Sequence, residues 1–364
     1  MIDVHLICAA RPNFMKVAPL YHALAETDWA QPTLIHTGQH YDRNMSDAIL
    51  EDLGIPLPDH HLGIGSGSHA EQTGNVMIAY EKLCTETRPD WIVVVGDVNS
   101  TAACAQVGAK LLIPVIHLEA GLRSRDRRMP EEINRLITDV IADVLWTPSE
   151  DADENLLKEG VASDKIELIG NIMIDSFEML RDRIEQARSA ETLGVAPGGY
   201  ALVTLHRPSN VDSRETLEPI VDALIGAAAE LPVVFVAHPR TMKGLERFGL
   251  KDKLEAHDNV LLQEPIPYAR FMSLVTTAQV VITDSGGLQE ETTYLGIPCL
   301  TLRENTERPV TVTLGTNELI DADSLSERLA IVVAGNWKTG ARPPLWDGQT
   351  AARAVESLKR RAGA

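Results

Sequence analysis

Short apolar runs alternate with longer segments of helical character along the first half of the chain. The apolar runs predict strands at 4–9, 33–37, 91–96, 114–118, 144–148 and 165–170. The segments between them predict helices at 15–26, 71–87, 100–110, 131–142 and 150–159. Near-continuous apolar strands separated by helices are typical of a parallel sheet that is covered on both faces. We therefore predict a doubly wound α/β domain in this half.

The same alternation starts again after a polar break at 192–199, with strands predicted at 201–206, 233–238, 260–264, 280–284 and 298–302. We predict an α/β chain of two Rossmann-like, doubly wound domains. The first spans 1–170 and the second 171–348, and 349–364 is expected to form a helix whose packing partner the pattern does not decide. Ligands of open parallel sheets bind beyond the carboxyl ends of the strands, so we expect the site in a cleft between the domains.

Charge and composition narrow the classes of protein that fit this pattern. The 364 residues suffice for two domains of ordinary size. With 33 basic and 52 acidic side chains, the net charge of −19 argues against a nucleic-acid partner. No apolar stretch approaches the ~18 residues of a membrane-spanning helix, and the N-terminus reads as a buried strand rather than a signal peptide. The four cysteines form no Cys-x-x-Cys pair, so we expect buried thiols in a reducing cytoplasm.

Three carboxylates follow predicted strands of the first half. Asp97 comes directly after strand 91–96, where an aspartate can take part in acid–base chemistry or cap the next helix. Glu119 follows the next strand in apolar surroundings that would favour its protonated form. Glu131 stands in the first turn of a helix that begins at Pro130, where the helix dipole favours a carboxylate. Helix-start preferences explain each acid alone, but three at one sheet edge favour an acid–base site.

Cations and histidines also stand at predicted strand ends. Arg11 and Lys16 lie where the first strand gives way to a helix, a place that suits an anionic ligand but also fits a solvated turn. His206 and His238 each end a strand of the second half and each have an arginine within two positions. A lone histidine is more often structural, yet this repeated placement favours a role with phosphate or in acid–base chemistry.

The run Thr-Asp-Ser-Gly-Gly-Leu-Gln-Glu-Glu at 283–291 is the strongest local signal. A strand leads into small residues and then a helix, so the amides of Ser285, Gly286 and Gly287 can bind a phosphate at close approach. Glu291 is placed to accept hydrogen bonds from ribose hydroxyls, and Arg308 offers a cation downstream. The sequence contains no Gly-Lys pair, so this is not a P-loop.

No motif predicts a bound cofactor. The stretch 65–70 loosely matches Gly-x-Gly-x-x-Ala, but it follows no predicted strand and lacks the acidic residue that a dinucleotide site needs about 20 residues later. We interpret it as a loop. No His-Glu-x-x-His or paired Cys-x-x-Cys spacing predicts a metal site.

Nine motifs together resemble the non-hydrolysing UDP-N-acetylglucosamine 2-epimerase family. They run in family order over nearly the whole chain: RPNFMKVAPL, TGQH, GDVNST, HLEAGLRS, MPEEINR, TLHRPSNV, AHPR, TDSGGLQEE and ENTERP. The resemblance implies two Rossmann-like domains in the glycosyltransferase-B arrangement, a UDP-sugar in the cleft and a cytoplasmic homodimer. It also implies that neither a metal nor a nicotinamide is needed.

The resemblance implies a reaction and the groups that perform it. In the family, the C2 proton of the sugar is removed and UDP leaves anti to give 2-acetamidoglucal. UDP then returns and a proton is replaced on the other face of C2. The two faces call for more than one proton-transfer group, and the matching residues are Asp97, Glu119, Glu131 and His206. Which carboxylate serves which face stays open.

The resemblance also implies substrate-binding residues. Arg11, Lys16 and Arg308 would neutralise the pyrophosphate. Ser285, Gly286 and Gly287 would hold phosphate and Glu291 the ribose, while His238 would meet a phosphate or the sugar and Pro265 to Phe271 would line the uracil.

The chain departs from the family pattern at several positions. Asn13 replaces a frequent glutamate, and Pro208 and Ser209 replace the Arg-Glu that often follows His-Arg. Members that their own substrate activates carry a second glutamine shortly after the TGQH-like glutamine and an arginine downstream. Here the chain has Asp42 and the glycine- and serine-rich run 63–68. We therefore expect no substrate activation, which hyperbolic kinetics would reveal.

Three alternatives remain beside the expected substrate, UDP-N-acetylglucosamine. The TGQHYD, GSGSH and RRMPEEINR segments also resemble a branch that epimerises UDP-2,3-diacetamido-2,3-dideoxyglucuronic acid at C2. A retaining glycosyltransferase or a non-catalytic nucleotide-sugar binding protein would share the architecture. The carboxylate trio argues against these last two, because neither needs acid–base groups at C2.

Overall fold

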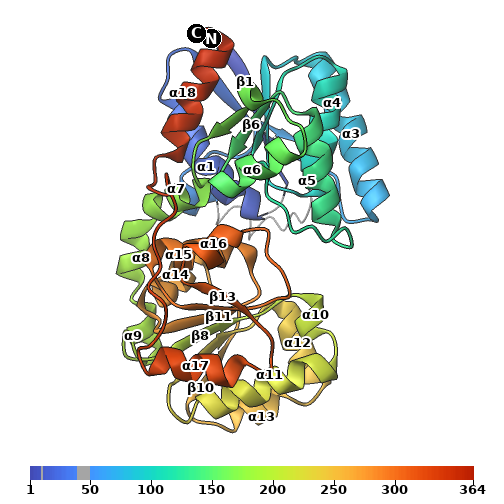
Figure 1. Cartoon of the computed structure of the whole chain (residues 1–364). Coiled ribbons are helices and arrows are strands. Elements are labelled where there is room, and N and C mark those ends of the chain that lie inside the picture. The colour runs from blue at the N-terminus through green and yellow to red at the C-terminus, as the bar shows by residue number, and fades with distance from the viewer. Residues whose placement is uncertain (10, 39–49) are drawn as a thin grey trace. The chain divides into compact units, whose positions relative to one another are not determined.

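The chain forms two compact units, each built on its own parallel sheet (Figure 1). The computed structural model describes residues 1–9, 11–38 and 50–364. The first unit contains Met1–Met179 and Pro344–Ala364, and the second contains Leu180–Pro343. The division therefore falls after Met179 and not after residue 170, because the helix Ile172–Met179 packs within the first unit, where Ser176 Oγ donates to the backbone oxygen of Met15.

The first unit holds a seven-stranded sheet in the order β3-β2-β1-β4-β5-β6-β7, with all neighbours parallel. Strands such as WIVVV of β4 are buried along nearly their whole length, as the two-sided cover of a parallel sheet requires. The strands are β1 (Ile2–Cys8), β2 (Ala30–His36), β3 (His60–His61), β4 (Trp91–Val95), β5 (Val115–Leu118), β6 (Val144–Thr147) and β7 (Ile166–Leu168). The helices are α1 (Arg11–Ala25), α3 (His69–Glu86), α4 (Asn99–Lys110), α5 (Pro130–Ile141), α6 (Glu150–Lys158), α7 (Ile172–Met179) and α18 (Thr350–Ala362), with the 3-10 helix η1 (Ser163–Lys165).

The C-terminal helix α18 belongs to the first unit, which settles what the sequence pattern leaves open. It packs against α1 and α7, and Figure 1 shows it in red beside the blue α1. The indole Nε1 of Trp146 donates to Ser357 Oγ at 2.9 Å, and the amide of Ala351 donates to Asp175 Oδ1 at 2.8 Å. The chain thus returns to cover the sheet where it began.

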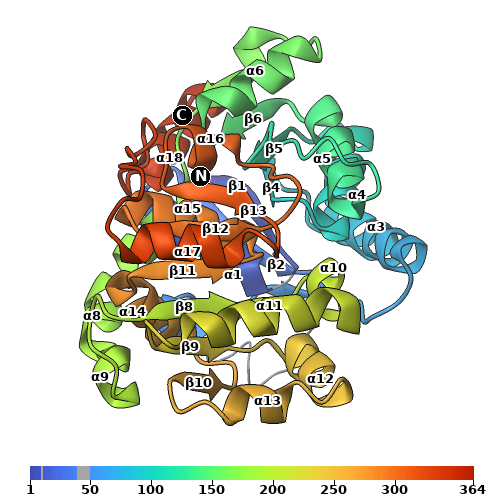
Figure 2. The same ribbon diagram turned by 60° about the horizontal axis from the view of Figure 1, so that its bottom comes forward.

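The second unit holds a six-stranded sheet in the order β10-β9-β8-β11-β12-β13, again all parallel. Figure 2 shows α11 and α17 lying along one face of it, and both contribute to its apolar core. The strands are β8 (Ala201–Thr204), β9 (Val233–Val236), β10 (Val260–Gln263), β11 (Val280–Thr283), β12 (Cys299–Leu302) and β13 (Asn317–Ile320). The helices are α8 (Arg181–Ala187), α9 (Ser189–Leu193), α10 (Pro208–Val211), α11 (Arg214–Ala227), α12 (Pro239–Arg247), α13 (Lys251–Glu255), α14 (Tyr268–Thr277), α15 (Gly286–Leu295), α16 (Pro309–Thr313) and α17 (Leu325–Val333).

Both sheets have the strand order of a Rossmann fold, and this order points to where a ligand binds. In each sheet the winding reverses next to the first strand, between β1 and β4 in one and between β8 and β11 in the other. At such a switch point the two following helices leave on opposite faces, so a crevice opens beyond the carboxyl ends of the strands.

All strands that the sequence pattern predicted are present in the structure. The pattern missed β3, which has only two residues, and β13, of which only half the residues are apolar.

Three further features concern thiols, membrane-spanning helices and clusters of metal-ligand side chains. The four cysteines are free and buried, as expected. No described helix combines the length and apolar character that crossing a membrane requires. Within the described residues, no three histidine, cysteine or acidic side chains gather as metal ligands would.

Candidate active site

Glu119 and Lys16 form an ion pair at the carboxyl edge of the first sheet. Glu119 directly follows β5 and is only 7% exposed, and Lys16 on α1 donates from Nζ to its Oε2. The backbone of Glu119 has a φ of 76°, in the left-handed region that few residues other than glycine adopt. The amides of Glu119 and Ala120 both donate to the backbone oxygen of Trp146, which turns the chain sharply there. Such backbone strain concentrates at functional sites.

Gly96 brings the end of β4 against this ion pair. Its φ is 67°, and a Cβ built on it would lie 3.3 Å from both Glu119 Oε2 and Lys16 Nζ. A side chain at position 96 would therefore crowd the pair. Asp97 is the next residue, so two of the three predicted carboxylates stand on turns that approach each other closely.

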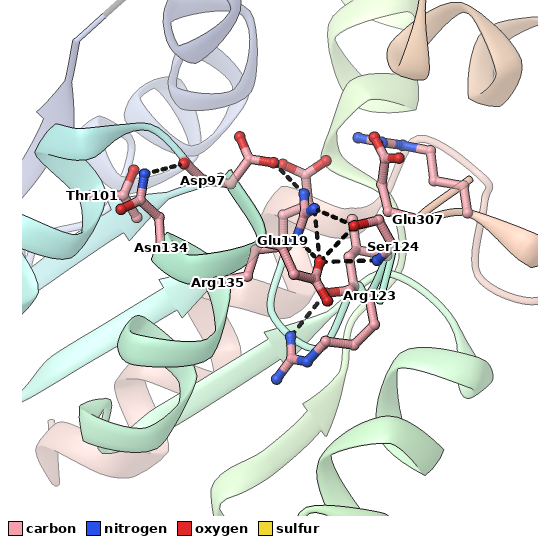
Figure 3. A network of polar contacts seen from close by, with 12 residues as sticks. Asp97, Thr101, Glu119, Arg123, Ser124, Asn134, Arg135 and Glu307 are labelled. Carbon is pink, nitrogen blue, oxygen red and sulfur yellow. Dashed lines mark hydrogen bonds and ion pairs between the residues drawn. The ribbon is translucent and has the colours of Figure 1, made fainter. Parts of the chain in front are cut away.

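Asp97 has a cation partner of its own, Arg135 on α5 (Figure 3). Arg135 is 2% exposed, and its Nη1 lies 2.5 Å from Asp97 Oδ2 while its Nη2 lies 2.9 Å from Glu132 Oε2. Glu132 also accepts from the amides of Ser124 and Arg125, both at 2.9 Å, which ties the loop after β5 to α5. Although burial opposes ionisation, the bonds from Ser124 and Arg135 lower the pKa of Glu132.

Among the described side chains, the other residues of the first half that the sequence singled out take no part in the Glu119–Lys16 or Asp97–Arg135 ion pairs. Glu131 stands in the first turn of α5, as expected, with its side chain exposed. Asn13 is buried and donates from Nδ2 to the backbone oxygen of Val95 at 3.1 Å, so it holds α1 to the end of β4. Arg11 begins α1, and its side chain, like Asp42 as a whole, lies outside the described part of the chain. Of the stretch 65–70 that we interpreted as a loop, only 65–68 is one, because the capping box at Ser68 starts α3 at His69.

The predicted phosphate site lies at the amino end of α15 in the second unit. Ser285 is the N-cap, and its side chain makes no capping bond to the first turn, which starts with Gly286 and Gly287. The first amides of a helix favour an anion because they lack partners within the helix. A Cβ at Gly286 would lie 2.8 Å from Arg308 Nη1 and 2.9 Å from Glu307 Oε1, so a side chain here would displace the ends of both.

Arg308 lies at the amino end of α15 but is already held by two acids. It is 7% exposed, with its Nε 2.7 Å from Glu290 Oε1 and its Nη1 2.5 Å from Glu307 Oε1. Glu307 also accepts from Arg303 at 2.8 Å. A phosphate at this helix end would therefore meet a cation whose position two buried carboxylates fix.

His206 rests on a buried aspartate at the switch point of the second sheet. Asp284 has no exposed surface and accepts from the amides of His206 at 3.0 Å and Arg207 at 2.8 Å. The ring Nδ1 of His206 lies 3.0 Å from Asp284 Oδ1. Although burial opposes ionisation, these partners lower the pKa of Asp284. The ring of His238, from the next strand end, lies 5.7 Å from that of His206, centre to centre, and burial together with His206 lowers its pKa.

The expected ribose and uracil residues also lie at this edge of the second sheet. Glu291 on α15 is 5% exposed, and Tyr268 donates to its Oε1 at 2.5 Å. Burial raises the pKa of Glu291 to about 7, which Tyr268 opposes and Glu290 supports. Pro265 follows β10 and Phe271 stands on α14, so both belong to the segment that leaves this strand end.

Comparison with known proteins identifies the family. The family model described as UDP-N-acetylglucosamine 2-epimerase matches residues 22–359. The chain belongs to the UDP-N-acetylglucosamine 2-epimerase family. The resemblance carried by the nine motifs is thereby confirmed, and it places the chain in an isomerase family whose solved members share its two-domain α/β fold.

Two relatives and one solved structure show how much of this epimerase-family chain is shared. UDP-N-acetylglucosamine 2-epimerase of Methanocaldococcus jannaschii is 41% identical over 364 residues, covering 98% of this chain and 99% of that protein. The crystal structure of the Methanocaldococcus jannaschii epimerase in complex with UDP-GlcNAc and UDP aligns with a TM-score of 0.88 at 40% identity, covering 99% of this chain and 100% of that one. UDP-2,3-diacetamido-2,3-dideoxy-D-glucuronate 2-epimerase of Pseudomonas aeruginosa is 40% identical over 320 residues, 87% of each chain.

Sequence reasoning missed the residues that hold the predicted ones in place. Arg135, Glu132, Asp284 and Tyr268 each contact a predicted residue or its loop. One signal for the first two was present, since α5 places Glu132 and Arg135 on one face at a spacing of three. Asp284 lies inside the run 283–291, which we interpreted as a phosphate-binding motif. Nothing in that run indicates that Asp284 contacts His206, which follows a different strand.

Proposed function

We propose that the protein reversibly converts UDP-N-acetylglucosamine into UDP-N-acetylmannosamine by epimerisation at C2. A base takes the C2 proton while the bond from C1 to the UDP oxygen breaks, giving 2-acetamidoglucal and UDP. UDP then adds back, and a proton is delivered to the opposite face of C2. The single observation that carries the proposal is the pair of carboxylates, Asp97 and Glu119, at adjacent strand ends of the first sheet, each beside its own cation.

The cation partners suit the two carboxylates to proton transfer. Each carboxylate is held by a cation at a fixed place, and a base must be positioned accurately to take a proton from C2. From the sequence we expected only apolar surroundings for Glu119. The structure shows that Glu119 is buried but has the Lys16 ammonium as an ion-pair partner. Glu131 and His206 are proposed as the further proton-transfer groups that a reaction on two faces needs.

The second sheet supplies groups suited to the nucleotide. We assign phosphate to the amides of Ser285, Gly286 and Gly287, and the ribose to Glu291. Arg308 is proposed to neutralise the pyrophosphate, with Arg11 and Lys16 as further cations. His238 is proposed to meet a phosphate or the sugar, and the segment from Pro265 to Phe271 to line the uracil.

A second candidate substrate is UDP-2,3-diacetamido-2,3-dideoxyglucuronic acid. The 40% identity to the Pseudomonas aeruginosa 2-epimerase of that sugar favours it, and it would need the same chemistry at C2. The two candidates differ at C3 and at the C6 carboxylate, not at the carbon where the proposed proton transfer takes place.

The test is proton exchange at C2 with each sugar alone. The protein is incubated in D2O with one UDP-sugar and no acceptor, metal or nicotinamide, and NMR follows the C2 position. We expect deuterium at C2 and the appearance of the C2 epimer with one of the sugars, and neither with the Glu119→Gln variant. A transferase or a passive binding protein would leave C2 protonated with both sugars, which would refute the epimerase proposal.

We also propose that the chain acts as a homodimer, as its family resemblance implies. Helix α5 buries a polar face, formed by Glu132, Arg135, Thr138 and Asp139, and turns apolar residues outward. Among these outward residues, Val140 is 73% exposed. A helix with this inverted pattern needs a second apolar surface against its outer face.

The mass in solution tests the dimer. Val140→Asp places a charge on the outer face of α5 and is expected to shift the mass from dimer towards monomer in light scattering. The matched change Leu157→Asp, on α6 at a residue that is 51% exposed, should leave the mass unchanged. A monomeric wild-type protein would contradict the proposal.

A further inference from the structure

His117 and Asp139 form a fully buried pair behind the turns that carry Asp97 and Glu119. His117 lies on β5 with no exposed surface, and Asp139 lies on α5 with 2% exposed. The ring Nδ1 of His117 is 2.6 Å from Asp139 Oδ1. Its Nε2 is 2.8 Å from the backbone oxygen of Gly96. Neither residue is among the proposed proton-transfer groups, because both are shielded from any substrate.

Hydrogen bonds fix the orientation of this histidine ring. The carbonyl oxygen of Gly96 can only accept, so Nε2 of His117 donates to it. Asp139 Oδ2 accepts from Arg123 Nη1 at 2.6 Å and from the amide of Gly121 at 3.1 Å. Although burial opposes ionisation, His117 and Arg123 lower the pKa of Asp139. The ring is therefore held between the backbone at the end of β4 and a carboxylate that is itself bonded to the turn after β5.

The His117–Asp139 pair contacts both turns that carry the proposed bases, the one at Gly96–Asp97 and the one at Glu119–Gly121. Through Gly96 O it holds the residue directly before Asp97, at the end of β4. Through the amide of Gly121 it holds the residue two positions after Glu119, at the end of β5. Gly121 has a φ of 79°, and a Cβ there would lie 2.5 Å from the backbone oxygen of Ala152, so a side chain at this turn would clash with the backbone of α6.

Arg123 anchors the pair from the other side. Its Nη2 and Nε contact Glu159 at 2.6 and 2.9 Å, and its Nη1 contacts Asp139. A continuous set of polar contacts thus runs from His117 through Asp139 and Arg123 to Glu159. Such a chain holds a fixed geometry, because displacing any member would leave a buried charge without its partner.

We propose that His117 and Asp139 are positioning residues that set the spacing of the Asp97 and Glu119 turns for proton transfer at C2. This inference rests on the proposed function, since it is the placement of its two carboxylates that the pair controls. The pair touches no substrate. Its effect is expected on the rate of the chemical step and not on nucleotide binding, because proton transfer depends steeply on the position of the base.

The first experiment measures kinetics in His117→Gln and Asp139→Asn. We expect kcat for C2 exchange to fall by about 100-fold, as for a misplacement of about 1 Å. The KM for the UDP-sugar and the Kd for UDP should change by less than about threefold, since nucleotide groups are assigned to the other unit. The double variant should fall little further than either single variant, because the residues act as one unit. Matched controls are His257→Gln and Asp258→Asn, both at exposed positions.

The second experiment tests the contact to Gly96 without measuring a rate. In 15N-histidine-labelled wild-type protein, the Nε2–H of His117 should give a ring N–H correlation that exchanges slowly with water, because this group is buried and bonded to the Gly96 oxygen. The correlation is assigned by its absence in His117→Gln. A wild-type protein in which no His117 ring N–H is protected from exchange would overturn the proposal.

The outcomes separate this inference from the proposed function. Wild-type protein that exchanges no deuterium with either sugar refutes the epimerase proposal. Wild-type exchange together with unchanged kcat in the folded variants refutes the positioning role alone. Equal losses of kcat and of UDP affinity would show a general loss of structure and would also overturn it.

Discussion

The guanidinium of Arg135 lies 2.5 Å from the carboxylate of Asp97, and it is itself held 2.9 Å from Glu132. Glu119 instead faces the Lys16 ammonium. The two proposed bases therefore differ in the cation beside them. Arg135 is fixed in the protein interior by a second acid, whereas Lys16 reaches Glu119 on a flexible four-carbon stem. These different partners lead to different expectations when each cation is removed.

Arg135→Met should lower both stability and activity. Glu132 would be left buried without its guanidinium partner, and breaking a buried pair in this way costs about 3–5 kcal/mol. Urea unfolding at neutral pH measures the change in the free energy of unfolding. The matched control is Arg128→Met, whose partner is Asp126 and whose side chain is 81% exposed, where a loss of less than about 1 kcal/mol is expected. Equal losses in the two variants would contradict a structural role for the buried pair.

Lys16→Met should lower kcat far more than it lowers stability. The change leaves Glu119 without its cation and removes a positive charge proposed to face the pyrophosphate. Loss of one such electrostatic group costs about 100-fold or more in kcat. Steady-state kinetics of C2 exchange measure the loss, and Lys110→Met, at an exposed residue that ends α4, serves as control. A kcat within about threefold of wild type would remove Lys16 from the proposed site.

Arg308→Ala should weaken UDP binding and also lower stability. Losing one charge-assisted contact to pyrophosphate costs about 1.5–3 kcal/mol of binding free energy. The structure adds a second effect, because Glu290 and Glu307 would lose their shared guanidinium. Calorimetric titration with UDP and thermal unfolding without ligand separate the two effects. Arg328→Ala, which breaks a half-exposed pair with Glu318, is the control, and wild-type UDP affinity in Arg308→Ala would exclude the binding role.

Glu291 should make both stability and UDP binding depend on pH. Burial raises its folded-state pKa from 4.5 to about 7. The folded state therefore holds this proton more tightly than the unfolded state does, so the contribution to stability is fully present below pH 4.5 and is lost as the pH rises to about 7. The full effect is about 3 kcal/mol. Glu291→Gln should remove it, as unfolding measurements at pH 5 and pH 8 would show for both proteins.

The same titration should affect the nucleotide. An ionised Glu291 accepts more strongly from ribose hydroxyls than a protonated one does. UDP should therefore bind more tightly above about pH 7 than below it in the wild type. The variant Glu291→Gln should show no such step, and an identical pH dependence in both proteins would exclude Glu291 as its source.

The sequence alone determined the architecture and which polar side chains stand at the ends of the strands. Apolar runs of strand length separated by helical segments predict parallel sheets, because only a strand covered on both faces is apolar along its whole length. Once the sheets are parallel, residues that follow the strands must gather at the carboxyl edges. Asp97 and Glu119 were therefore predictable, as were Ser285 and Gly286 at the first turn of a helix.

Only the tertiary structure decided which groups support these residues. Arg135 reaches Asp97 across 38 positions of the chain, and Asp284 reaches His206 across 78. His117 and Asp139 read in sequence as a strand residue and a helix residue with no relation to each other. The C-terminal helix likewise joins the first unit through contacts more than 170 positions apart. The pattern of apolar and polar residues reflects local backbone preference and burial. The pairings listed here arise for a different reason, because packing brings distant segments of the chain together and each charge buried in this way needs a partner.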